Sequence, residues 1–191
     1  MNGNRVMVFI DGSNLYKRTK SLIGEGKQVN IEKLAHKLLN KRKLERIYYY
    51  NTPSPSEDPE EQKSQQKFLT KLGWINYLQK RMGRLVPKEY KVRCPSPDCG
   101  NEFTLKTHIQ KGIDTRIAVD MVTLAISDAY DIAILVSGDE DLVEAVDYIR
   151  EHTSKKVENS CALGAGWSIK LREASDTRIP LTKEYLKDCL V

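Results

Sequence analysis

Two short runs, Val6–Ile10 and Asp131–Val136, which are apolar apart from Asp131, constrain the fold of this chain more than any other feature of its sequence. Continuous runs of β-branched and other apolar residues are typical of strands buried on both faces of a parallel sheet. Each run leads into a carboxylate: Asp11 follows the first directly, and Ser137-Gly138-Asp139 follows the second. Ligands bind beyond the carboxyl ends of strands in open parallel sheets, so these acids predict a site at that edge.

The rest of the chain predicts helices that alternate with strands. We expect further strands at Arg46–Tyr50, Trp74–Leu78 and Lys156–Ala162. Helices are expected at Leu15–Ile23, Ile31–Leu39, Ser56–Leu72 and Gly112–Ala129, in a segment ending near His152, and in short stretches at Trp167–Ala174 and Thr182–Leu190. This alternation predicts an α/β fold, a three-layer α/β/α sandwich with a mostly parallel central sheet.

One segment departs from this pattern. A length of 191 residues favours one domain over residues 1–191. Residues 82–107 are irregular and carry two of the four cysteines. We therefore expect an inserted loop or hairpin there.

Charge and composition exclude several classes of protein without naming a function. Lys and Arg number 31 against 26 Asp and Glu, and this net charge of +5 permits an anionic partner without demanding one. No apolar run approaches the roughly 18 residues that span a membrane, and the run before Asp11 is too short for a signal peptide. Four cysteines make no disulfide framework. We expect a cytoplasmic protein that does not contact membranes.

A third acid, Asp114, begins the long predicted helix after Lys111-Gly112-Ile113. Asp11, Asp114 and Asp139 could each be a helix cap instead of a site residue. If the three carboxylates converge, their repulsion raises their pKa values unless a cation neutralises them. A hard divalent ion, Mg²⁺ or Mn²⁺, suits such oxygen ligands.

Three motifs in order carry a family resemblance. They are Val8–Leu15 (VFIDGSNL), Lys111–Asp114 followed by Asp120-Met121, and Leu135–Leu142 (LVSGDEDL), with Ser168, Leu171, Ala174 and Asp176 in the tail. Together they resemble the NYN domain, and more narrowly its LabA-like (DUF88) branch, within the PIN-like nuclease superfamily. The resemblance runs from Val6 to about Leu181.

The resemblance implies a metal-dependent ribonuclease, a hydrolase of RNA phosphodiesters. The family's acids fall on Asp11, Asp114, Asp139 and Asp141, its Asn on Asn14, and its Ser on Ser137. Asn14 would orient a water or a phosphate, and Ser137 would bind metal or cap a helix. Metals held by such carboxylates bind a phosphate oxygen, activate water and stabilise the leaving oxygen.

Two further acids match the family pattern. We expect Asp120 to be structural, with a role in the site as the alternative. Asp120 lies six residues from Asp114, about 240° around a helix, so both cannot face one ion squarely. Asp176 is a weaker candidate still.

Basic residues near the proposed site predict contacts with RNA. Lys17 and Arg18 start within two turns of Asp11, and Lys111 precedes Asp114 by three residues. The stretch 80–93 combines Arg81 and Arg84 with Tyr90. Cations beside an aromatic platform hold single strands without reading sequence.

The two cysteines of the inserted segment, Cys94 and Cys99, resemble one knuckle of a zinc ribbon. A structural zinc needs four ligands. His108 could be a third, and a second subunit could supply the rest, so a homodimer is left open. We expect a hairpin with a degenerate knuckle rather than bound zinc.

Three functions are compatible with these residues. The first is a ribonuclease that uses Mg²⁺ or Mn²⁺. The alternative is a non-catalytic RNA- or protein-binding module on the same fold, which would keep its affinity when the metal is chelated. A small phosphatase or nucleotide hydrolase ranks last, because the first strand leads into Asp11-Gly12-Ser13 and not into an obvious nucleophile motif of the Asp-x-Asp kind.

Overall fold

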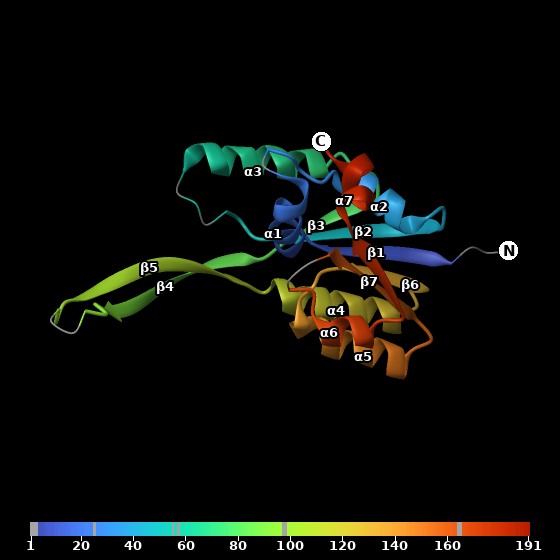
Figure 1. Ribbon diagram of the computed structural model, residues 1–191. Coiled ribbons are helices and arrows are strands. Elements are labelled where there is room, and N and C mark those ends of the chain that lie inside the picture. Colours follow the sequence, from blue (N-terminus) through green and yellow to red (C-terminus); the bar gives the residue numbers. More distant parts are fainter. Residues whose placement is uncertain (1–3, 25, 55, 57, 97–98, 164–165) are drawn as a thin grey trace.

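A parallel six-stranded sheet forms the centre of the molecule, which we describe from a computed structural model (Figure 1). The structure describes residues 4–24, 26–54, 56, 58–96, 99–163 and 166–191. The strands are β1 (Arg5–Asp11), β2 (Lys43–Asn51), β3 (Leu78–Met82), β6 (Ile132–Val136), β7 (Lys156–Ala162) and β8 (Thr177–Leu181). Their order is β3-β2-β1-β6-β7-β8, and every neighbouring pair is parallel.

Helices cover both faces of this sheet (Figure 1). One face carries α1 (Gly12–Ile23), α2 (Ile31–Leu39), α3 (Pro59–Leu72) and α7 (Lys183–Leu186), and the other carries α4 (Ile113–Ile126), α5 (Val143–His152) and α6 (Ile169–Ala174). Two 3₁₀ turns, η1 (Glu140–Leu142) and η2 (Lys187–Cys189), precede α5 and follow α7. The predicted three-layer α/β/α sandwich is confirmed. None of the described helices is both long and apolar enough to cross a membrane.

The alternation of side chains along β1 explains why there are two cores. Val6, Val8 and Ile10 pack under α1 and α2, whereas Met7 and Phe9 pack under α4 and α5. All five are buried. A strand with an apolar residue at every position can exist only where both faces of its sheet are covered.

The structure corrects the third predicted strand. Trp74–Leu78 is not a strand: residues 73–77 form turns, and β3 begins only at Leu78. Trp74 is 83% exposed, and Tyr77 has a φ of 62°. The prediction was wrong because aromatic residues, which are common in strands, lie in a turn here.

A sixth parallel strand was missed by the sequence reasoning. β8 is a short edge strand in which Pro180 interrupts the apolar pattern. Proline is tolerated there because an edge strand leaves one side of its backbone unpaired.

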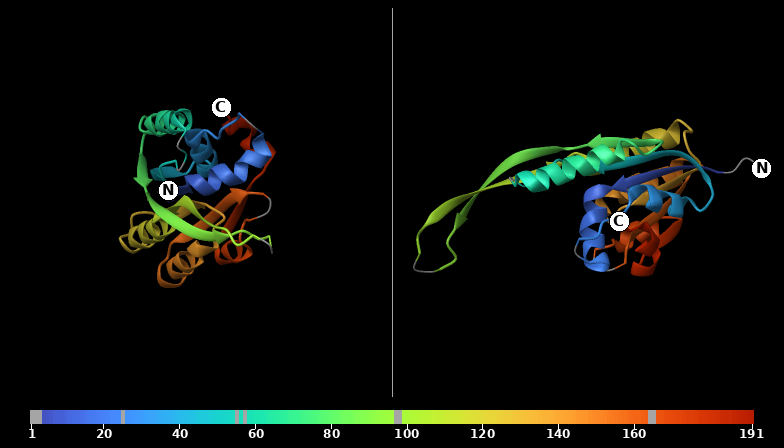
Figure 2. Two further views of the ribbon diagram at one scale, coloured as in Figure 1. Left: turned by 90° about the vertical axis from the view of Figure 1, so that its left-hand side faces the viewer. Right: turned by 90° about the horizontal axis from the view of Figure 1, so that it is seen from above.

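The segment between β3 and α4 is a regular antiparallel ribbon rather than an irregular loop. β4 (Arg84–Arg93) and β5 (Glu102–Lys111) pair over ten registers, from Arg84↔Lys111 to Arg93↔Glu102. Figures 1 and 2 show this ribbon projecting well beyond the sheet and its helices. We call it the arm.

Candidate functional site

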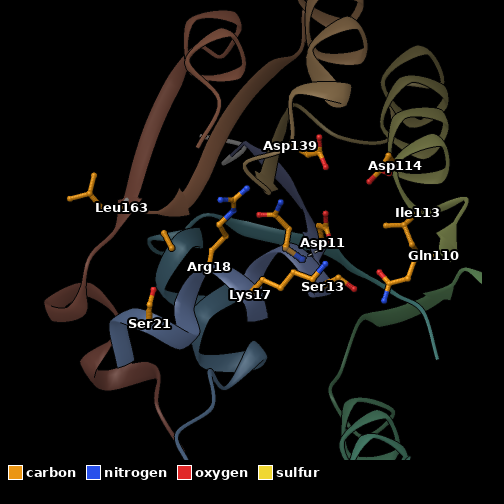
Figure 3. A pocket seen from close by; sticks show the side chains of 12 residues that line it. Asp11, Ser13, Lys17, Arg18, Ser21, Gln110, Ile113, Asp114, Asp139 and Leu163 are labelled. Atoms are coloured by element: carbon orange, nitrogen blue, oxygen red, sulfur yellow. Dashed lines mark hydrogen bonds between the residues drawn. The ribbon is translucent and has the colours of Figure 1, made fainter. Parts of the chain in front are cut away.

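A cleft lies at the carboxyl ends of β1 and β6, where the chain segments that leave these two neighbouring strands run in opposite directions along the sheet. β1 pairs with β6 in register Ile10↔Val136, and the chain leaves β1 toward β2 but leaves β6 toward β7. Such a switch point opens a crevice beyond the strand ends. The cleft has a volume of about 600 Å³. It is lined by Asp11, Ser13, Asn14, Lys17, Arg18, Ser21, Gln110, Ile113, Asp114, Asp139, Ala162 and Leu163 (Figure 3).

Asp11 is the deepest acid of the cleft, with 4% of its surface exposed. It is the N-cap of α1, since its Oδ1 accepts a hydrogen bond from the backbone N–H of Asn14 at 3.0 Å. Its Oδ2 accepts from the hydroxyl of Ser137 at 3.3 Å. Burial raises the pKa of Asp11 to about 6; the Asn14 hydrogen bond opposes that shift, and the nearby charge of Asp114 adds to it.

Hydrogen bonds tie the ends of β1 and β6 together around this acid. The Oδ1 atom of Asn14 accepts from the backbone N–H of Gly138 at 3.1 Å, and the Oγ atom of Ser137 accepts from the N–H of Asp139 at 3.2 Å. Asn14 and Ser137 therefore fix the turn that carries Asp139. A Cβ at Gly138 would lie 2.7 Å from the Sγ atom of Cys161, so only glycine fits this turn.

Asp139 and Asp141 differ in position although they are two residues apart. Asp139 is half-buried and lines the cleft, and its Oδ1 accepts from the N–H of Asp141 at 3.2 Å to cap η1. Asp141 is exposed and does not line the cleft. Three of the four acids implied by the family resemblance thus line one cleft, and the fourth does not line it.

Asp114 enters the cleft from the first turn of α4. Gly112 turns the chain from β5 into this helix with a φ of 86°, which glycine adopts without strain. Burial, followed by the charge of Asp139, raises the pKa of Asp114 above its usual range. Asp11 and Asp139 do cap helices, as the alternative predicted. Capping does not explain why Asp11, Asp114 and Asp139 line the same cleft.

The donor chemistry of these acids fits a hard divalent cation. Burial is the main cause of the raised pKa values of Asp11 and Asp114, and the charge of neighbouring carboxylates adds to it; a bound cation offsets both effects. Within the part of the chain that the structure describes, no three His, Cys, Asp or Glu side chains are grouped closely enough for a preformed metal site.

Two cations face the acids across the cleft. Lys17 and Arg18 approach from α1, whereas the carboxylates come from the ends of β1 and β6 and from α4 (Figure 3). Arg18 also lines a second hollow of about 300 Å³ with Trp167 and Ser168. A Cβ at Gly166 would fall 1.4 Å from the Nη1 atom of Arg18, so the loop before α6 closes directly on this guanidinium.

The other cations predicted to contact RNA lie outside the cleft. Lys111 and Arg84 are exposed register partners at the root of the arm, and Tyr90 is farther out along it. Arg81 forms an ion pair with Asp120 at 3.3 Å and lies over the ring of Tyr48.

Asp120 and Asp176 have partners within the fold. Asp120 accepts a hydrogen bond from the hydroxyl of Tyr50 at 2.9 Å. Asp176 pairs with Arg150 at 3.3 Å and accepts from the N–H of Val157 at 2.8 Å. Neither acid lines the cleft.

Sequence reasoning missed residues that shape the cleft. Gln110 lines it from the end of β5, at the root of the arm, and Ser13 and Ser21 line it from α1. Asn159 is fully buried on β7, donates to the carbonyl of Ser137 at 2.8 Å, and accepts from the indole N–H of Trp167. The strand sequence KVENSCA mixes polar and apolar residues, so it carried no signal that singled out Asn159.

The arm separates the proposed zinc ligands. Cys94 and Cys99 lie near its tip, where a hydrogen bond with the backbone of Asn101, and then one with the side chain of Cys94, lower the pKa of Cys99. His108 pairs with Pro87, six registers from Arg93↔Glu102, which corresponds to about 20 Å along the strand. One zinc ion could not bind all three residues of a single chain.

The fold and the cleft define the class of this protein: a parallel α/β sandwich of the PIN-like nuclease type, with acids at its switch point. The sequence matches the NYN domain over residues 5–182, and the chain belongs to this family. The predicted resemblance to the NYN domain is thus confirmed.

Among solved structures, the chain is similar to a protein of unknown function from Vibrio parahaemolyticus RIMD 2210633. The two are 19% identical with a TM-score of 0.62, over 100% of this chain and 98% of the other. This likeness supports the fold alone. No curated protein matches the chain.

Proposed function

We propose that this protein is a metal-dependent ribonuclease that hydrolyses RNA phosphodiester bonds in the switch-point cleft. One observation carries the proposal: three carboxylates from three elements face Lys17 and Arg18 within one cleft of a PIN-like fold. A polyanion enters such a cleft only where cations offset the acids. Membership of the LabA-like branch and a cytoplasmic location are part of the same proposal.

The acids and the cations of the cleft each have a defined task in this proposal. Asp11, Asp114 and Asp139 would hold Mg²⁺ or Mn²⁺, with Asp141 and Ser137 in support. The ion, when bound, would neutralise the carboxylates and polarise the phosphoryl group. Lys17 and Arg18 bind the phosphates, and Asn14 fixes the turn that carries Asp139.

The test is cleavage of labelled RNA and DNA oligonucleotides with Mn²⁺ or Mg²⁺, with and without chelator. Asp139→Asn and Asp114→Asn should each lower the rate more than about 100-fold, because even partners of metal ligands are worth about 10- to 100-fold. Asparagine retains the cap at position 139, so the variant should fold. Circular dichroism checks this.

Asp188→Asn is the matched control, since Asp188 is exposed and distant from the cleft. It should cleave like the wild type. Undiminished, chelator-resistant cleavage by Asp139→Asn and Asp114→Asn would exclude these acids from the reaction.

A non-catalytic RNA-binding module is the second candidate. It is favoured by the lack of a preformed three-ligand group among the described residues and by the hydrogen bonds that already engage both oxygens of Asp11. Such a module would bind RNA equally with and without chelator and would release no product.

A further inference from the structure

The two faces of the arm differ in chemistry. Side chains alternate between the faces of a β-ribbon, and register partners share a face. We call one side the aromatic face, formed by Arg84, Val86, Lys88, Tyr90 and Val92 with their partners Lys111, Ile109, Thr107, Leu105 and Phe103. We call the other side the mixed face, formed by Leu85, Pro87, Glu89, Lys91 and Arg93 with Gln110, His108, Lys106, Thr104 and Glu102.

All ionisable charges on the aromatic face are positive. They belong to Arg84, Lys88 and Lys111. Both acids of the two strands, Glu89 and Glu102, lie on the mixed face, where Glu89 pairs with Lys106 at 3.5 Å. The aromatic face therefore complements a polyanion, whereas the mixed face partly neutralises itself.

Apolar groups on the same face remain in contact with solvent. Tyr90, Phe103 and Leu105 are 40%, 53% and 51% exposed. The Nζ atom of Lys88 lies 4.6 Å from the centroid of the Tyr90 ring. Exposed rings interleaved with cations are the means by which proteins hold single strands, since bases stack on the rings while the cations contact phosphates.

The aromatic face begins next to the cleft. Arg84 and Lys111, the first pair of this face, lie at the root of the arm, where Gly112 joins β5 to the cleft residues Ile113 and Asp114. Gln110, which also lines the cleft, belongs to the mixed face. Ten registers give the arm a length of about 30 Å. A strand whose phosphate occupies the cleft could thus continue outward along this face.

We propose that the aromatic face binds the single-stranded part of an RNA that extends from the cleft. The inference rests on the proposed function, because the cleft defines where the strand starts. Tyr90 and Phe103 stack with bases, and Arg84, Lys88 and Lys111 contact the backbone. The arm makes affinity depend on the length of the RNA rather than on its sequence.

A pair of lysines tests the proposal. Lys88 and Lys91 lie on the same strand, each opposite a threonine, but on opposite faces. Lys88→Gln should weaken binding of a long single-stranded RNA. It should also reduce the slope of log Kd against log salt concentration by the contribution of about one phosphate contact. Lys91→Gln should leave both quantities unchanged. Fluorescence anisotropy measures binding with chelator present, which prevents cleavage.

Ring removal gives a second measurement. Tyr90→Ser and Phe103→Ser should each weaken binding of the long RNA about 5- to 100-fold, the range found for single stacked bases. His108→Ser removes a ring from the mixed face and should have no effect. A short RNA that fills only the cleft should bind all these variants and the wild type alike.

Three results would overturn the proposal. They are equal losses from Lys88→Gln and Lys91→Gln, equal losses for short and long RNA, and a wild-type dimer in sedimentation that Phe103→Ser dissociates without changing RNA affinity. The last result would assign the face to a second copy of the chain. If only the proposed ribonuclease function is wrong, RNA still binds through the arm but is not cleaved with Mn²⁺.

Discussion

At the scale of single residues, Asp11 combines two roles that make opposite demands. It caps α1 and therefore must be fixed, and it contributes charge to the cleft although only 4% of it is exposed. Burial and its neighbours make ionisation costly, as its pKa of about 6 shows. Ionisation of such a buried acid costs free energy, and a bound cation offsets this cost.

The metal-free protein should lose stability as the pH rises from about 4 to 7. The pKa of Asp11 is higher in the folded chain than in the unfolded one, so its contribution is present below the unfolded value and is lost through about pH 6. The loss should reach about 3 kcal/mol, since one pKa unit corresponds to about 1.4 kcal/mol. Urea unfolding at a series of pH values measures it.

Asp11→Asn should retain the cap and remove the part of this slope that Asp11 contributes, while Asp114, whose pKa is also raised, keeps its own part. Mg²⁺ should restore stability in the wild type alone. A wild-type slope that persists in Asp11→Asn would assign the titration to another group. Asp131 acts in the opposite direction: hydrogen bonds from Arg5 lower its pKa to about 2, so its contribution is lost only as the pH falls toward that value.

At the scale of elements, the junction between the arm and α4 decides where Asp114 points. Gly112→Ala should destabilise the protein by about 1–2 kcal/mol, because φ at this position is 86° and an alanine there is strained. Nothing lies within 4 Å of the added Cβ, so the strain should relax through a rotation of α4. This rotation would move Asp114, and RNA cleavage should therefore decrease.

Gly26→Ala is the matched control for that substitution. Gly26 has a φ of 75° and equally open surroundings, but it lies in the loop between α1 and α2. Urea unfolding should show a similar loss of stability with unchanged cleavage. Equal loss of cleavage in both variants would mean that stability, not the aim of Asp114, limits activity.

The elements differ in how far the sequence predicted them. β7 and α2 have the predicted bounds, and β1 and β6 lie within a residue of theirs, because continuous apolar runs and helical spacing depend on local pattern. The sequence did not predict β8 and placed β3 too early, because a short edge strand and an aromatic turn are defined by their neighbours in space.

The motifs predicted that Asp11, Asp114 and Asp139 belong to one site, and all three line the cleft. The contacts of Asn159 and Arg18 could not be predicted, because they depend on the three-dimensional structure.

At the scale of the whole molecule, we propose that the chain is one domain with the arm as an insertion. Replacing residues 88–107 by Asn-Gly would join the register partners Pro87 and His108 through a two-residue turn. The free energy of unfolding should change by less than about 0.5 kcal/mol, since the removed part projects from the domain.

Urea unfolding and anisotropy with long RNA check this variant together. Affinity for the long RNA should fall while the unfolding midpoint stays in place. Loss of cooperative unfolding would mean that the arm belongs to the folding core and would contradict the single-domain description.

The switch point also dictates the order in which the chain can fold during synthesis. β2 follows soon after β1 and covers one of its edges, but the other edge waits for β6, which emerges only after the arm and α4. At ribosomal speed this delay is on the order of ten seconds. An apolar strand with an open edge recruits other strands, so this interval is when the nascent chain is most prone to aggregate.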